Sequence, residues 1–162
     1  MARHPVPADL IDDLNRLMAE EAEACLRYFQ MRFRVRGPGA AAAGRFFEEA
    51  IKETLEHADA LARQIHALGH IPALRINLTL DGASMRSGEA LAEALDVEQQ
   101  ALDAYQEFLP RVAGDPTLEK FIREQIATET EHVEEIKHVV RTAHSLKLVT
   151  PRTAGSPKTR RP

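Results

Sequence analysis

Apolar residues recur every three or four positions along four stretches of the chain, which is the spacing of one face of an α-helix. Glycine and proline residues stand between the stretches, and these residues typically begin and end helices. The pattern therefore predicts an all-α fold built from four long helices. The expected helices cover residues 8–36, 41–68, 89–112 and 116–144.

The connection between the second and third expected helices, residues 70–88, has no helical periodicity. About nineteen residues is long for a turn between antiparallel neighbours, but it is enough to run the length of a bundle. We therefore expect these two helices to lie parallel in a four-helix bundle, joined by a long crossover. The alternating run from Leu74 to Leu80 is expected to be extended along the outside.

Charged residues interrupt the apolar faces near the middle of each expected helix. Glu21 interrupts the face of the first helix, and Glu98 does the same in the third. A buried carboxylate needs a cation, a metal ion or several hydrogen bonds to compensate for its lost hydration. The second and fourth helices each add a glutamate and a histidine about one turn apart. The candidate metal ligands are thus Glu21, Glu53, His57, Glu98, Glu129 and His132.

This set of residue types is typical of the carboxylate-bridged di-iron and di-manganese centres in helix bundles. Carboxylate oxygens with one imidazole per metal suit Fe(II) or Mn(II), and no thiolate is in place to favour a structural zinc site. Four glutamates would also neutralise two divalent ions. We expect two iron ions, with manganese or zinc as alternatives.

A glutamate and a histidine at this spacing can also lie in solvent. Glu135 and His138 are separated like Glu129 and His132, but they share a helix face with Glu131, away from the apolar side. We expect this second pair to be an ordinary solvated pair on the surface.

The same periodicity predicts which apolar side chains fill the core. It places Phe29 of the first helix and Leu55 of the second on the core side. Tyr28 is expected in the core, hydrogen-bonded near the candidate ligands.

Charge divides the chain into two parts. The five basic residues after Ser145 have no acidic neighbour, and removing them from the 21 basic residues leaves 16 against 25 acidic ones. The remainder thus carries a formal charge of about −9, which attracts cations rather than nucleic acid. We expect a bundle over residues 1–146 and a disordered basic tail over residues 147–162.

The number of cysteines and the hydropathy of the chain indicate the cellular compartment in which we expect the protein. Cys25 is the only cysteine, so no internal disulfide can form. No apolar run suggests a secretory signal or a membrane span, and we expect a cytoplasmic protein without membrane contact.

These residues resemble the ferritin-like superfamily, and bacterioferritin most closely. The run LNRLMAEEAEACLRYF (14–29) is similar to that family's first helix, and EAIKETLEHADAL (49–61) is similar to its second. Tyr105 and Glu98 fit the third helix, and Glu129 with His132 fits the fourth. The resemblance covers about residues 9–144. It implies that Glu21, His57, Glu98, Glu129 and His132 bind two iron ions.

The resemblance also implies a function. It suggests a ferroxidase that oxidises Fe(II) with oxygen or hydrogen peroxide, for iron storage or detoxification, in a homo-oligomer. Two other interpretations stay open. One is a peroxide scavenger similar to rubrerythrin, which would need electrons from a partner because the chain has no rubredoxin-type cysteine pairs. The other is a non-catalytic ferritin-like subunit.

The chain departs from the family pattern on the second helix and at the end. Thr54 stands where the family has a bridging glutamate, and Glu53 is one residue earlier, so Glu53 is an open sixth ligand. Leu55 stands where bacterioferritins have the haem-ligating methionine, so haem is not expected. The family's short fifth helix is poorly matched, so the resemblance does not extend to a closed cage. A dimer through the first two helices is still expected.

Overall fold

Four long helices make up most of the computed structural model, which describes residues 7–148 and the side chains of residues 7–142. The helices are α1 (Ala8–Arg34), α2 (Ala40–Ala67), α3 (Ser87–Phe108) and α4 (Pro116–Leu148). The expected all-α fold and its four helices are confirmed, and the bounds differ by a few residues. The end of the third expected helix is a separate 3₁₀ turn, η1 (Leu109–Val112). The fourth helix extends past His144, and residues 149–162 of the expected tail lie outside the described residues.

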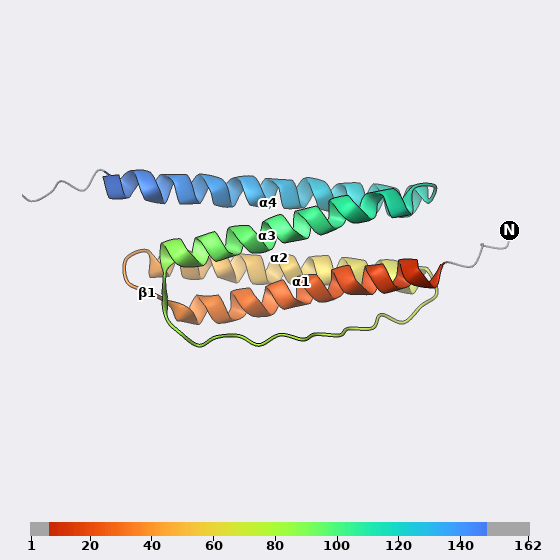
Figure 1. Cartoon of the computed structure of the whole chain (residues 1–162), viewed down its shortest axis with the longest axis horizontal. Coiled ribbons are helices and arrows are strands. Elements are labelled where there is room, and N and C mark those ends of the chain that lie inside the picture. The colour runs from red at the N-terminus through yellow and green to blue at the C-terminus, as the bar shows by residue number, and fades with distance from the viewer. Residues whose placement is uncertain (1–6, 149–162) are drawn as a thin grey trace, which may run out of the picture.

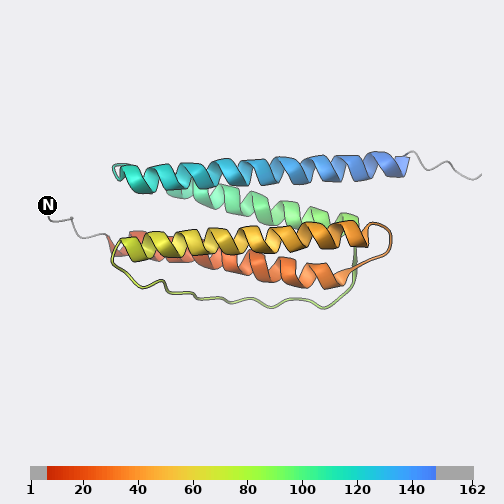
Figure 2. The same cartoon turned by 180° about the vertical axis from the view of Figure 1, so that it is seen from behind.

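The helices form two hairpins that lie against each other. α1 packs most extensively on α2, and α3 on α4 (Figure 1). α2 and α3 run in the same direction, and residues 70–84 between them run back along the outside of the bundle without helix or strand (Figure 2). The predicted crossover is thus confirmed.

Polar contacts hold the crossover to α1. The backbone N–H of Ala73 donates to Asn15 Oδ1 at 2.8 Å, and Arg34 Nε donates to the Ala83 carbonyl at 2.7 Å. At the far end, the two-residue strands β1 (Val35–Arg36) and β2 (Met85–Arg86) pair in parallel. Sequence periodicity gave no sign of this pairing, because two residues are too few to show an alternation.

The core has an apolar cluster at each end and a polar layer between them. One cluster is built around Leu14, Leu61 and Ile122, and the other around Phe47 and Ile136. Four buried polar residues lie at mid-bundle among the described side chains. They are Glu21, Thr54, Glu98 and Glu129.

Two predicted core residues are on the surface instead. Phe29 is 53% exposed and Leu55 is 58% exposed, so their placement in the core was wrong. Each directly follows a buried residue, Tyr28 in α1 and Thr54 in α2, and one residue along a helix turns the side chain by about 100°. Both therefore lie just outside the buried stripe.

Among the described residues, no helix combines the length and the apolar content that a membrane span requires.

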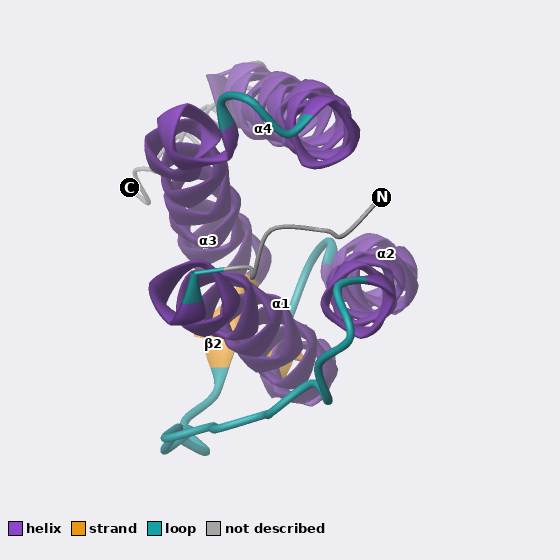
Figure 3. Cartoon of the chain, turned by 90° about the vertical axis from the view of Figure 1, so that its right-hand side faces the viewer, coloured by secondary structure: helices purple, strands orange, loops and turns teal. Residues whose placement is uncertain are grey.

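The arrangement of the helices seen end-on is shown in Figure 3.

The turn before α2 offers a matched test of the packing between the hairpins. Gly37 and Gly39 both have positive φ angles, of 82° and 84°. A Cβ on Gly37 would meet nothing within 4 Å, whereas one on Gly39 would lie 2.9 Å from Ser87 Oγ, which donates to the Pro38 carbonyl.

We expect Gly37→Ala to cost about 1–2 kcal/mol for the left-handed backbone alone. Gly39→Ala should cost about 1 kcal/mol more, because the Ser87 hydroxyl must give up its hydrogen bond. Urea denaturation of both variants measures the difference. Equal losses would show that Ser87 does not link the start of α3 to this turn.

Candidate metal centre

The polar layer brings together side chains from all four helices. Glu21 comes from α1, His57 from α2 and Glu98 from α3, while Glu129 and His132 both come from α4. Glu129 and His132 lie on one side of α4 because residues three apart are neighbours on a helix surface. Five of the six candidate ligands predicted from the sequence thus meet in one place.

The first group of potential ligands consists of Glu21, His57 and Glu129. His57 Nδ1 lies 2.9 Å from Glu129 Oε1 and 3.6 Å from Glu21 Oε2. One potential ligand atom from each of the three residues lies within 4.8 Å of the others. These separations are short enough for the three residues to ligate a single metal ion.

The second group consists of Glu98, Glu129 and His132. His132 Nδ1 lies 3.3 Å from Glu98 Oε2 and 3.7 Å from Glu129 Oε2. The imidazole rings of His57 and His132 are nearly parallel, with their centroids 5.7 Å apart. Glu129 belongs to both groups and turns one oxygen toward each, which is the position of a bridging carboxylate.

Two buried atoms in the first group support a metal ion at this place. His57 Nδ1 and Glu129 Oε1 are close, but their geometry is not that of a hydrogen bond, and neither has another hydrogen-bond partner in the described part of the chain. The two atoms attract each other as an ion pair when His57 is protonated, but each still lacks a well-aligned hydrogen bond, which is costly for a buried polar atom. A metal ion between the two atoms would satisfy both, so the residues fit a metal centre.

Two tyrosines hold the outer carboxylates from across the bundle. Tyr105 of α3 donates a hydrogen bond of 2.6 Å to Glu21 Oε1, and Tyr28 of α1 donates to Glu98 Oε1. Burial, together with the nearby carboxylates, raises the pKa of both tyrosines well above the usual value. Both phenols thus stay protonated and act as donors. The expected core position and hydrogen bond of Tyr28 are confirmed, while the bond from Tyr105 was not foreseen.

The charges of the layer compensate one another. Burial disfavours the charged form of His57, but Glu129 and Glu21 outweigh it and raise the pKa of His57 to about 10. Glu129 and Glu98 likewise raise the pKa of His132 to about 10. Burial would raise the pKa of Glu129, but the two histidines lower it to about 2. Without metal, protonated histidines therefore neutralise part of the buried negative charge.

Glu53 lies at the edge of this arrangement. Its side chain is 51% exposed, and its Oε2 is 3.6 Å from His132 Nε2, the nitrogen that does not face Glu98 and Glu129. It belongs to neither group of three. Thr54 is the inward residue at this level of α2, and its hydroxyl donates to the Ala50 carbonyl at 2.8 Å.

The second glutamate–histidine pair of the fourth helix, predicted to be solvated, is on the surface. Glu135 and His138 are exposed on α4, although their spacing equals that of Glu129 and His132. The apolar context, and not the spacing, separates the two pairs.

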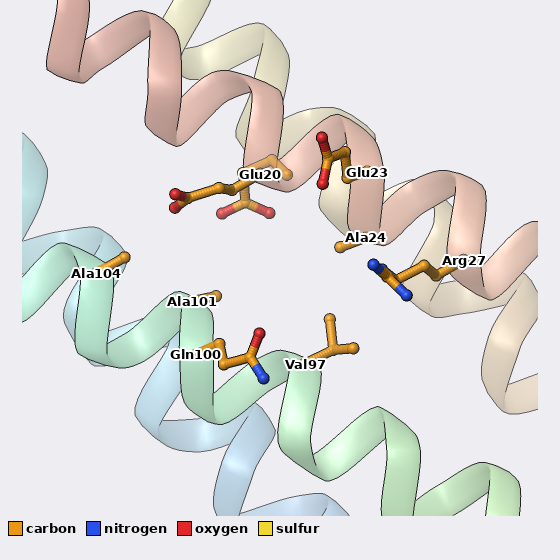
Figure 4. Close-up of a pocket in the computed structure, with 9 residues that line it drawn as sticks. Glu20, Glu23, Ala24, Arg27, Val97, Gln100, Ala101 and Ala104 are labelled. Carbon is orange, nitrogen blue, oxygen red and sulfur yellow. The ribbon is translucent and has the colours of Figure 1, made fainter. Parts of the chain in front are cut away.

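A groove between α1 and α3 leads from the surface to Glu21. Its volume is about 210 Å³, and Glu20, Glu23 and Arg27 line it on the α1 side. Figure 4 shows these side chains on α1, with Gln100 on α3 across the groove. Small residues leave the space open, namely Ala24, Ala101 and Ala104. The sequence did not predict the groove, because alanines at these positions are equally typical of close helix packing.

Comparison with known proteins agrees with this fold. The profile of a family described as "Ferritin-like domain" matches residues 11–145, so the chain belongs to the ferritin-like family. The expected resemblance is thereby confirmed. No curated protein matches the sequence.

Two solved structures are similar over most of their length. One is described as ferritin-like, diiron-carboxylate proteins from Bacillus anthracis str. Ames, with 28% identity, a TM-score of 0.73, and coverage of 86% of this chain and 99% of that one. The other is a dodecameric thioferritin, the bacterioferritin-related protein from Bacteroides fragilis, with 25% identity, a TM-score of 0.76, and coverage of 88% and 91%.

The raised histidine pKa values predict how the metal-free protein responds to pH. Below the ordinary value of 6.5 the histidines are charged whether the chain is folded or not, so their ion pairs contribute fully. This contribution is lost as pH rises toward about 10. We expect the free energy of unfolding, measured with urea and a chelator, to fall between pH 6.5 and 10.

The exposed His138 provides the control. His57→Gln should weaken the pH dependence more than His138→Gln does, because of these two histidines it is His57 that lies against the buried carboxylates. A wild-type stability that is flat over this range would contradict the charge arrangement.

Proposed function

We propose that this protein binds two Fe(II) ions in the polar layer and oxidises them, as a ferroxidase of bacterioferritin-like type that serves iron storage or detoxification. The observation that carries the proposal is the position of Glu129, with one oxygen toward each of two groups of ligands. Membership of the ferritin-like family and similarity to a diiron-carboxylate protein support it.

Each ion has its own ligands and shares one. Glu21 and His57 would hold the first ion, Glu98 and His132 would hold the second, and Glu129 would be shared by both. Carboxylate oxygens and imidazole suit Fe(II), with manganese or zinc as competitors. The Leu55 side chain has no donor atom, so haem is not part of the proposal.

The chemistry requires two ions close together because the oxidants take electrons in pairs. Each Fe(II) gives up one electron. Molecular oxygen with two electrons and two protons becomes hydrogen peroxide, and hydrogen peroxide with two electrons and two protons becomes two water molecules. The hydrogen bonds from Tyr28 and Tyr105 keep the outer carboxylates in place.

Fe(II) reaches the centre through the groove between α1 and α3. Glu20 and Glu23 lie on its wall, and it ends at Glu21, which is a ligand in this proposal. The three carboxylates outnumber the one guanidinium group of Arg27 on this path, and an excess of negative charge along a confined path raises the local concentration of cations.

The protein acts as a homo-oligomer, at least a dimer through the faces of α1 and α2. Large apolar side chains are exposed there, and an exposed patch of this kind marks an interaction surface. On α1 and α2 they are Leu26, Phe29, Phe33 and Leu55. The dodecameric relative from Bacteroides fragilis supports assembly without fixing the number of subunits.

Anaerobic titration with Fe(II), followed by exposure to oxygen or peroxide, tests the metal proposal. We expect two tight Fe(II) ions per chain and oxidation of both. Glu129→Gln should lose both, because the bridge serves each ion, whereas Glu135→Gln on the exposed face of the same helix should behave like the wild type.

Oxidation of fewer than one Fe(II) per chain, under conditions in which a ferritin control oxidises two, would contradict the ferroxidase proposal. Peroxide turnover without ferric mineral would favour a scavenging role instead. No bound Fe(II) would favour a non-catalytic subunit.

The assembly proposal has a separate test. Phe29→Glu places a charge in the exposed apolar patch, and we expect it to shift the sedimentation coefficient to that of a monomer. Ala127→Glu, also at an exposed position but on α4, should keep the wild-type value. A wild-type protein that sediments as a monomer at micromolar concentration would contradict the proposal.

A further inference from the structure

α2 contributes one ligand to the polar layer and no carboxylate. His57 belongs to the first group, and Thr54, three residues earlier on the same face, is buried at the same level. A threonine side chain is shorter than a glutamate and carries no charge. Its hydroxyl is already bonded to the carbonyl of Ala50, one turn back in α2. Thr54 therefore supplies neither the reach nor the charge of a bridging ligand.

Glu53 does not replace the missing carboxylate in this geometry. The two nitrogens of the His132 ring point in different directions, and the one that belongs to the second group is Nδ1. Glu53 lies against the other nitrogen, Nε2, and half of its side chain is in solvent. This is the position of a residue that orients a ligand histidine, not of one that bridges two metals.

The negative charge of the ligands is then smaller than the positive charge of two divalent metal ions. Three carboxylates, those of Glu21, Glu98 and Glu129, face four positive charges, which leaves one positive charge in a layer between two apolar clusters. An uncompensated charge in such surroundings is strongly unfavourable. Water can fill a coordination position, but it removes this charge only when it loses a proton, so a bridging hydroxide is the alternative that the titrations below distinguish from an oxyanion.

We propose that the centre takes up a small oxyanion as its second bridge, bound to both metals on the α2 side next to Thr54. The ligand class is an anion with two oxygens on one atom, such as phosphate or a monocarboxylate, because that spacing matches the bridge that Glu129 provides on the α4 side. Binding of this anion supplies the missing negative charge. The inference rests on the proposed two-metal site.

The second metal and the oxyanion should therefore bind cooperatively, since each lowers the cost of burying the other. A titration with Co(II) under chloride alone, compared with titrations in inorganic phosphate or in acetate, measures this without any turnover. Visible absorption of Co(II) reports the number of ions and their coordination.

In chloride we expect one tight Co(II) per chain and a second that binds at least about tenfold more weakly. Phosphate or acetate should tighten the second ion by at least about tenfold and change the absorption bands. A response to phosphate alone would assign the site to phosphate, and a response to both would assign it to any two-oxygen anion.

Thr54→Glu restores an internal carboxylate and should bind two Co(II) ions in chloride alone, with no further gain from either anion. Thr142→Glu is the matched control, because Thr142 is exposed on α4 and makes the same backbone hydrogen bond as Thr54. That variant should keep the anion dependence of the wild type.

Two equally tight Co(II) ions in chloride, with no effect of either anion, would overturn this inference and leave the two-metal proposal standing. No tight Co(II) under any condition would overturn the two-metal proposal, and this inference with it. The wild-type titrations decide between these outcomes even if Thr54→Glu fails to fold.

Discussion

The burial of Glu129 is the constraint around which the rest of the bundle is arranged. Its side chain is 1% exposed, at the middle of a core that is otherwise apolar above and below. A carboxylate in this position is tolerated only with charged or hydrogen-bonding partners on every side. Two histidines lie on either side of it, and two more carboxylates follow, each held by a tyrosine. Each helix therefore has polar residues in its core-facing side at this level.

The same arrangement explains how the protein can stay folded without metal. Protonated histidines stand in for the cations, so the layer keeps partial charge balance. Metal ions and protons compete for the same atoms, because a metal-bound imidazole nitrogen cannot also carry a proton. The metal-free site therefore contains buried ion pairs, and their contribution to the stability of the fold depends on pH.

Much of this could be predicted from the sequence, because helical periodicity records which side chains face inward. The four helices and the inward positions of Glu21, Glu98 and Glu129 follow from the apolar stripe in which these residues lie. The long crossover follows from the loss of that periodicity over residues 70–88. Phe29 and Leu55 were misplaced because each adjoins a buried residue, and a difference of one position is within the error of a periodic pattern. Contacts across the bundle, such as Tyr105 with Glu21, depend on the relative height of two helices, which the sequence of either one does not contain.

The division of the ligands between the two hairpins has a consequence for folding. Glu98, Glu129 and His132 all belong to the α3–α4 hairpin, whereas Glu21 and His57 belong to the α1–α2 hairpin. The second group can therefore assemble within one hairpin, from segments joined by a short turn. The first group exists only after the hairpins dock, since it combines Glu129 with residues from the other hairpin. An ion held there would link the two hairpins, and its loss would weaken their docking before either hairpin unfolds.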